Sequence, residues 1–494
     1  MREKGRSESC VSAGDPAVGT AAAAELWTGS WVLERLAMEI SSSCSSGGLS
    51  LEKLVGLAIR RNPRRAHLLV SNVLGKHVPA DPRLVYGVGL ALGETVDRFL
   101  AGLGDTGHPS ELPAALGGDA VALGSLLNSL RLAREARGSR DEFGPPTVLG
   151  FAETATGLGH AVADFLDAPY IHSTRRSVPG IAPLAGFTEE HSHAADHHLL
   201  PSDSQFMNRA GALVLVDDEL TTGRTAMNTI LALHQQSPRS HYVLASLVDL
   251  RTPTDCAVAG DLARRLGVQI DVVSLVSGEV RQPSDVLRRA AGVLDQYGAE
   301  EPVLLTTSST APVTELEVRW PPHVLETGRH GYESQDRTEL DATLHEAASP
   351  IIELLRGLEP GSHVHLLGTE EFTYVPLRLA IQVAEDLPQA TVTFSSTTRS
   401  PVLPIDEPGY AIRSSLTFLS HDDPTDGSTV RYAYNLSSGG DAQFDAIVVL
   451  VDASADSPSL RSSGGLVAAL RHITRRVLVI VIPRRSSPVG LSAP

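Results

Sequence analysis

The segment from Leu213 to Ala226 constrains the chain more than any other, because it has the sequence LVLVDDELTTGRTA. Its first four residues are all apolar, which is typical of a strand that is buried on both faces. Two acids and a run of small residues follow, and a helical pattern begins near Ala226. Ligands of parallel α/β sheets bind beside the carboxyl ends of the strands. The segment therefore predicts a polar ligand site at the edge of a parallel sheet.

Each part of this segment suits a phosphorylated sugar. Asp217 and Asp218 can accept hydrogen bonds from two neighbouring hydroxyl groups and can help to hold a hydrated Mg2+ ion. The loop after the acids offers backbone amides, hydroxyls and a helix N-terminus to a phosphate dianion, and it consists of Thr221, Thr222, Gly223, Arg224 and Thr225. The alternative interpretation is an ordinary strand, turn and helix with acids at the end of the strand.

The stretch resembles the signature with which type I phosphoribosyltransferases bind 5-phosphoribosyl-1-pyrophosphate (PRPP). That signature consists of apolar residues, two acids, a short spacer and a Thr-Thr-Gly-x-Thr loop, and Arg224 replaces its commoner second glycine. The resemblance implies an Mg2+-dependent pentosyltransferase. Such an enzyme transfers ribose 5-phosphate from PRPP to a nitrogenous base or base-like acceptor and releases pyrophosphate, or it catalyses the reverse reaction.

Members of this family also have a pyrophosphate loop after an earlier strand. The segment 150–157 occupies that place, and its candidate PRPP-binding residues are Ala152, Glu153 and Thr154. Taken alone, the segment is equally compatible with any glycine-punctuated loop. A further candidate is Lys76, one of only three lysines in the chain, in a segment Gly75-Lys76-His77 that also looks like a family segment.

The family closes a flexible loop over its substrates, and residues 174–193 fill that position. Because this segment contains no lysine, we expect the catalytic groups that neutralise the leaving group or act beside it to be Arg175, Arg176, Glu190 and His191. A zinc site is the alternative for its histidines, which are His191, His193, His197 and His198. No cysteine accompanies them, so a solvated lid is the favoured interpretation.

Nearly the whole chain resembles a bacterial two-domain family in which an orotate-phosphoribosyltransferase-like domain precedes a domain named for its Thr-Arg-Ser-Pro (TRSP) motif. That motif is present as residues 398–401, and Asn62-Pro63-Arg64-Arg65 also matches the family. The resemblance implies an association with tellurium-resistance and stress gene clusters and with a nucleotide-like metabolite. Candidate ligand groups of the second domain are Glu370, Glu371 and Arg399, although a helix cap with a structural salt bridge would also account for them.

The apolar runs predict a doubly wound, largely parallel sheet with a flexible hood, followed by a second α/β domain. First-domain strands are expected at 148–150, 170–172, 212–216, 242–247 and 268–275, and second-domain strands at 364–367, 391–394, 447–451 and 477–482. We predict a disordered extension over 1–50, the phosphoribosyltransferase domain with an N-terminal helical cap over 51–300, a linker over 301–350 and the TRSP domain over 351–494.

The formal net charge of -17 argues against nucleic acid or an anionic membrane as a partner, because both require a basic surface. Three cysteines without paired spacing and the lack of an 18-residue apolar run predict a soluble, cytoplasmic protein. The resemblance allows a homodimer. Two other functions stay open: a non-catalytic regulatory protein that senses PRPP or a nucleotide, and a protein whose second domain is the catalyst.

Overall fold

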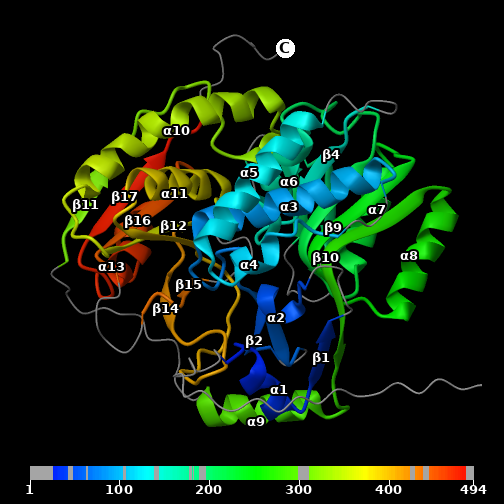
Figure 1. Cartoon of the computed structure of the whole chain (residues 1–494), viewed down its shortest axis with the longest axis horizontal. Coiled ribbons are helices and arrows are strands. Elements are labelled where there is room, and N and C mark those ends of the chain that lie inside the picture. The colour runs from blue at the N-terminus through cyan, green and yellow to red at the C-terminus, as the bar shows by residue number, and fades with distance from the viewer. Residues whose placement is uncertain are drawn as a thin grey trace, which may run out of the picture.

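The structure is a computed structural model that describes residues 26–42, 48–62, 65–103, 107–137, 144–176, 178, 181, 183–188, 196–298, 311–422, 429–437 and 444–485. Figure 1 shows two sheets on opposite sides of the molecule, the first mainly green and the second orange to red. The predicted fold class is confirmed: a largely parallel first sheet and a second α/β domain.

The first sheet has the strand order β1-β10-β9-β8-β4-β5, and of these six strands only β1 is antiparallel to its neighbour. Its strands are β1 (Glu39–Ser42), β4 (Thr147–Gly150), β5 (Tyr170–His172), β8 (Leu213–Leu220), β9 (His241–Asp249) and β10 (Gln269–Arg281). Helices between or after them are α6 (Ala155–Leu166), α7 (Arg224–His234), α8 (Pro253–Leu266) and α9 (Val286–Tyr297). A short ribbon, β6 (Ala185–Thr188) with β7 (Asp196–Leu199), follows β5.

The prediction that residues 1–50 are a disordered extension is wrong for the part that the structure describes. Helix α1 (Ser30–Leu36) buries Trp31, Val32 and Leu36, and β1 pairs with β10. Serine, glycine and alanine surround this short apolar stretch in the sequence and obscure its pattern. Its order comes from elements far along the chain, because α1 packs against α9 and β1 pairs with β10.

The region predicted to be a helical cap contains α2 (Leu51–Leu54), α3 (Pro82–Leu100), α4 (Leu112–Leu116) and α5 (Ala120–Ala136). Helix α3 is part of the main core, because it packs against both α6 and α11. A Cβ atom on Gly89 would lie 2.5 Å from the Cβ of Ala161 on α6, so glycine permits this close packing. The region also contains an unpredicted antiparallel hairpin, β2 (Val55–Ile59) with β3 (His67–Ser71).

The second sheet has the order β11-β17-β16-β12-β13, and all of its neighbouring strands are parallel. Its strands are β11 (Val313–Leu316), β12 (His363–Gly368), β13 (Thr391–Ser396), β16 (Ala446–Asp452) and β17 (Val477–Ile482). The chain runs from β12 through α11 (Tyr374–Asp386) to β13 on one side, and later returns to β16 on the other side of β12. The remaining elements are α12 (Pro458–Arg461), α13 (Leu466–Leu470) and a hairpin of β14 (Ser415–Leu419) with β15 (Val430–Tyr434).

The prediction of a linker over 301–350 is also wrong where the structure describes this stretch, which begins at residue 311. Strand β11 extends the second sheet, and the long helix α10 (Ser334–Leu355) follows the single turn η1 (Gly328–His330). The prolines favoured a linker in the sequence. The helix nevertheless has a capping box between Glu333 and Asp336 and a buried stripe that includes Leu340, Leu344 and Ile351.

One continuous hydrophobic core extends through both sheets, and a smaller core lies beside the second sheet. The hairpin β2–β3 joins the two halves through backbone hydrogen bonds. Leu403 N donates to Ile59 O at 3.0 Å, and Ala411 N donates to Leu57 O at 3.2 Å. The two domains therefore form one packed unit.

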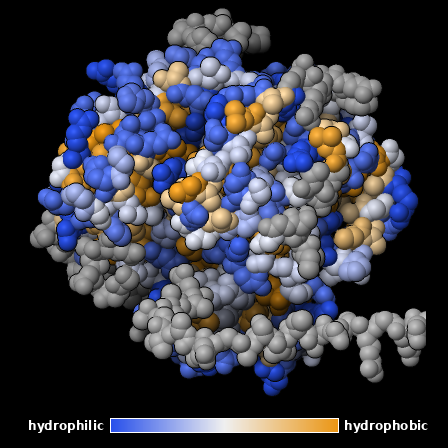
Figure 2. All heavy atoms as spheres, in the orientation of Figure 1, coloured by the Kyte–Doolittle hydropathy of each residue, from blue (hydrophilic) through white to orange (hydrophobic). Residues whose placement is uncertain are grey.

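Figure 2 shows that hydrophilic side chains cover most of one face of the molecule, with hydrophobic groups in small scattered areas. Among the helices that the structure describes, none combines the length and the apolar character needed to cross a membrane.

Candidate functional site

The carboxyl ends of the strands in both sheets point toward a common interface. The loop after β4 contacts a residue that follows β13, and the segment after β5 contacts a residue that follows β12 and the last residue of β16. Because ligands of open α/β sheets bind beside such strand ends, this interface is where both domains would hold ligands.

The predicted phosphate loop lies between β8 and α7. Gly223, the N-cap of α7, has a φ of 73°, a left-handed conformation that favours glycine. Within the described parts of the chain, the backbone amides of Thr221, Thr222 and Gly223 donate no hydrogen bond. Three such amides beside a helix N-terminus are a suitable cradle for a phosphate group.

The predicted pyrophosphate loop leaves the adjacent strand β4 at the same edge of the sheet. Phe151 N donates to Val216 O at 3.1 Å, which fixes this loop beside β8. The Ala152–Glu153 peptide bond is cis. The amides of Glu153 and Thr154 donate no hydrogen bond to any described residue, whereas Ala152 N donates to Ser173 Oγ at 3.0 Å. Two amides are thus free to bind a second anion next to the phosphate loop.

The acids at the end of β8 lie inside the strand, which continues to Leu220 rather than ending before them. Successive side chains of a strand alternate in direction, so Asp217 and Glu219 share one face of the sheet and Asp218 lies on the other. Burial and the neighbouring Asp218 raise the pKa of Glu219 to about 8, against the attraction of Arg60 and other cations.

Sequence reasoning did not single out Arg60, Arg65 or Glu219 as site residues. Arg60 and Arg65 are near enough to Glu219 to act on its charge, as is Lys76, and both arginines flank the loop between β2 and β3. The sequence feature that could have pointed to these arginines was the segment at residues 62–65, which matches the family. The β2–β3 hairpin therefore brings two cations toward the acids at the end of β8.

Lys76 lies at the pyrophosphate loop, where its ammonium group donates a hydrogen bond to the Thr154 hydroxyl. Its own loop is held by the second domain: Ser396 N donates to Gly75 O at 2.6 Å, and Asn435 Nδ2 donates to His77 O at 3.0 Å. A lysine is therefore present beside the candidate anion site. It comes from the chain before β4 and not from residues 174–193, which contain no lysine.

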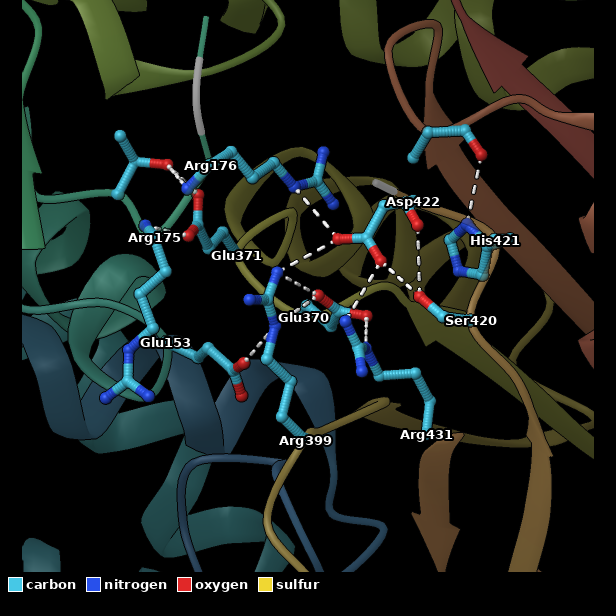
Figure 3. Close-up of polar contacts among 12 residues, drawn as sticks. Glu153, Arg175, Arg176, Glu370, Glu371, Arg399, Ser420, His421, Asp422 and Arg431 are labelled. Atoms are coloured by element: carbon cyan, nitrogen blue, oxygen red, sulfur yellow. Dashed lines mark hydrogen bonds and ion pairs between the residues drawn. The ribbon is translucent and has the colours of Figure 1, made fainter. Parts of the chain in front are cut away.

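The structure places the Arg176 side chain, a predicted catalytic group, against residues of the second domain. The side chain is buried, and its Nη1 donates to Asp452 Oδ2 at 3.2 Å and to Ser454 Oγ at 3.2 Å. The physical reason is that the chain after β5 crosses the carboxyl edge of the second sheet. Arg175 stays a candidate; its backbone N donates to Glu371 Oε1 at 2.7 Å, and Figure 3 shows its side chain directed away from that carboxylate.

The second-domain candidates take part in a buried network of ion pairs (Figure 3). Arg399 Nη2 lies 2.9 Å from Glu370 Oε2 and 2.9 Å from Asp422 Oδ2, and Arg431 Nε lies 2.8 Å from Glu370 Oε1. Glu371 accepts from the Thr174 hydroxyl at 2.7 Å and lies 3.6 Å from Arg329 Nε. The structure favours the interpretation of these residues as members of structural salt bridges, whereas the N-cap of α11 is Thr373.

The electrostatics of this network follow from burial and charge. Burial raises the pKa of Glu371, but Arg329 and Arg176 together outweigh it and lower the value to about 2. Asp452 behaves in the same way, so its pKa lies below the usual range. Burial and the nearby Asp422 raise the pKa of Glu370 to about 7, against the attraction of Arg399. Most of these carboxylates are therefore charged at neutral pH and paired with arginines.

Two predicted catalytic residues, Glu190 and His191, lie outside the described residues, as does His193. His197 is buried on β7, and its Nδ1 is 2.9 Å from the Ser173 hydroxyl. No group of three or more residues able to hold a metal ion exists among the residues that the structure describes.

Comparison with known families gives the same two-part organisation. Residues 54–279 match the model of the PRTase_2 family, described as phosphoribosyl transferase, and residues 326–470 match the TRSP domain, described as C-terminal to PRTase_2. The chain belongs to the PRTase_2–TRSP family. This PRTase_2–TRSP protein has no significant match among curated proteins.

Three solved adenine phosphoribosyltransferases resemble parts of the PRTase_2–TRSP protein. The Trypanosoma brucei enzyme, solved with AMP, pyrophosphate and ribose 5-phosphate, is 18% identical with a TM-score of 0.24, over 32% of this chain and 67% of that enzyme. The Leishmania donovani enzyme is 19% identical with a TM-score of 0.23, over 31% and 65% of the two chains. The Leishmania tarentolae enzyme is 20% identical with a TM-score of 0.22, over 34% and 74%.

Proposed function

We propose that the PRTase_2–TRSP protein transfers ribose 5-phosphate from PRPP to a nitrogenous acceptor and releases pyrophosphate, or catalyses the reverse reaction, which consumes pyrophosphate. One observation carries this proposal. Two sets of amides that donate no hydrogen bond within the described chain, at residues 153–154 and 221–223, leave adjacent strands and flank the acids of β8. This spacing suits a molecule with a phosphate at one end and a pyrophosphate at the other.

PRPP would bind with its 5-phosphate on the loop 221–225 and its ribose hydroxyls on Asp217 and Asp218. Its pyrophosphate would lie on Ala152, Glu153 and Thr154, beside Lys76. When the bond between C1 and the pyrophosphate oxygen breaks, negative charge grows on the leaving group. Lys76 and the loop amides are placed to stabilise that charge, and Arg175 is a further candidate. The reaction requires no covalent intermediate, so positioning provides most of the catalysis.

Magnesium fits this site as a partner of the substrate. Asp217 and Asp218 provide carboxylate oxygens, the ligand type that Mg2+ prefers. With these two acids as its ligands, the protein would supply part of the coordination, and the substrate and water would supply the rest. When bound, the ion would neutralise charge on the phosphate groups of PRPP. The residues that would hold it are Asp217 and Asp218, through water.

The test is calorimetric titration of the full-length protein with PRPP in the presence of Mg2+, followed by measurement of pyrophosphate release against a panel of nucleobases. We expect saturable binding and base-dependent release. Absence of PRPP binding would refute the proposal. Binding without release for any base would favour the alternative, a regulatory protein that senses PRPP.

A further inference from the structure

The TRSP motif contacts the pyrophosphate loop directly. The Thr398 hydroxyl donates a hydrogen bond of 3.1 Å to Glu153 Oε2, and Arg399 Nε lies 3.1 Å from Glu153 Oε1. One oxygen of this carboxylate is therefore hydrogen-bonded to the second domain, and the other lies at ion-pair distance from it. Figure 3 shows Glu153 and Arg399 pointing toward one another from different domains. Glu153 and Arg399 are both buried.

An acid in this loop opposes the function proposed for it. Pyrophosphate carries several negative charges, and a neighbouring carboxylate in a buried site would repel it. Arg399 provides a compensating positive charge within contact distance of that carboxylate. The loop can then present its two free amides to an anion while its acidic side chain is directed elsewhere.

The second domain also fixes the other elements around the same loop. The Thr373 hydroxyl lies 2.8 Å from the Thr156 hydroxyl, at the start of α6. Strand β13 holds the loop of Lys76, since Phe394 N donates to Ala80 O at 2.8 Å and Ser396 N donates to Gly75 O at 2.6 Å. By contrast, among the described residues the second domain forms no backbone hydrogen bond or β-bridge with the phosphate loop 221–223.

We propose that Thr398 and Arg399 are positioning residues for the pyrophosphate half of the PRPP site: they orient Glu153 and neutralise its charge. This inference rests on the proposed function. It gives the TRSP motif a specific role, because Arg399, a cation in contact with the acid of the pyrophosphate loop, comes from the second domain. It also implies that binding of the 5-phosphate half is independent of the motif.

The experiment measures the dissociation constants of pyrophosphate, PRPP and ribose 5-phosphate by calorimetry with Mg2+, using the full-length protein. Arg399→Gln should weaken the binding of pyrophosphate and of PRPP at least tenfold and leave the binding of ribose 5-phosphate unchanged. Thr398→Val should weaken the binding of the same two ligands several-fold, whereas Thr398→Ser, which keeps the hydroxyl, should bind them as the unaltered protein does. Arg413→Gln is the matched control, because Arg413 forms an exposed ion pair with Asp406 in the same domain.

The double variant Arg399→Gln with Glu153→Gln separates charge from general damage. If Arg399 neutralises Glu153, removing both charges should recover most of the lost pyrophosphate affinity. Equal weakening of all three ligands by Arg399→Gln, or no weakening at all, would overturn the inference. The proposed function has a separate readout: it fails if the unaltered protein binds neither PRPP nor ribose 5-phosphate.

Discussion

Lys76 and Thr154 are hydrogen-bonded to each other across 78 positions of sequence, with the lysine ammonium as donor and the threonine hydroxyl as acceptor. The contact brings a cation from the loop after β3 to the turn between β4 and α6. In a protein with a net charge of -17, a positive group next to free amides marks a local anion site.

Replacing Lys76 with Met should weaken the binding of PRPP and of pyrophosphate by about 10- to 100-fold, because a charge-assisted hydrogen bond contributes about 1.5–3 kcal/mol. Methionine keeps much of the length and apolar character of the side chain. Calorimetric titration with each ligand measures the change. Lys53→Met is the control, since Lys53 lies on α2 and its ammonium group donates to Pro113 O, which is not a residue of the candidate site. Equal affinity in Lys76→Met and the unaltered protein would remove Lys76 from the site.

Asp218→Asn should reduce PRPP turnover by about 100-fold while the fold is retained, because the loss of a charge that acts in the transition state is costly. Pyrophosphate release reports the rate, and circular dichroism reports the fold. Asp203→Asn provides a comparison, since Asp203 is an exposed residue that caps a turn through Gln205 N. An unchanged rate in Asp218→Asn would count against the assignment of the β8 acids.

The sequence could predict the strands that carry the candidate site, because each is a short apolar run with a clear boundary. It could also predict the loop around Gly223, since few residue types suit that conformation. It failed for α1, β1 and α10, whose order depends on packing against elements far away in the chain. Arg176 shows the same limit. An arginine is suited to neutralising a leaving group, but the partner of Arg176 is Asp452, the last residue of a strand nearly at the other end of the sequence.

Gly223→Ala tests the phosphate loop through backbone conformation. A non-glycine residue at a φ of 73° costs about 1–2 kcal/mol, and the new Cβ would lie 3.3 Å from Arg251 Cδ. We expect lower stability together with weaker ribose 5-phosphate binding. Gly267→Ala is the matched control, because Gly267 has a φ of 68° at the end of α8 and no atom within 4 Å of the new Cβ. Gly267→Ala should lose a similar amount of stability and keep its affinity for ribose 5-phosphate. If both variants lose affinity for ribose 5-phosphate to the same extent, the effect is global and does not arise in the phosphate loop.

The raised pKa of Glu219 predicts how the stability of the ligand-free protein depends on pH. Its pKa is about 8 in the folded protein and lies near its ordinary value of 4.5 in the unfolded chain. Between these values the folded state keeps a proton that the unfolded state has lost, so stability falls as pH rises through this window.

Glu219→Gln cannot ionise at this position and should not lose stability in this way as pH rises. Relative to the unaltered protein, its melting temperature should be higher at pH 8.5 by about 2–4 °C, but similar at pH 4.5. Glu359→Gln, a change at an exposed position, controls for the loss of one negative charge. Thermal unfolding at both pH values decides the question: if the two variants shift alike, Glu219 does not carry the retained proton.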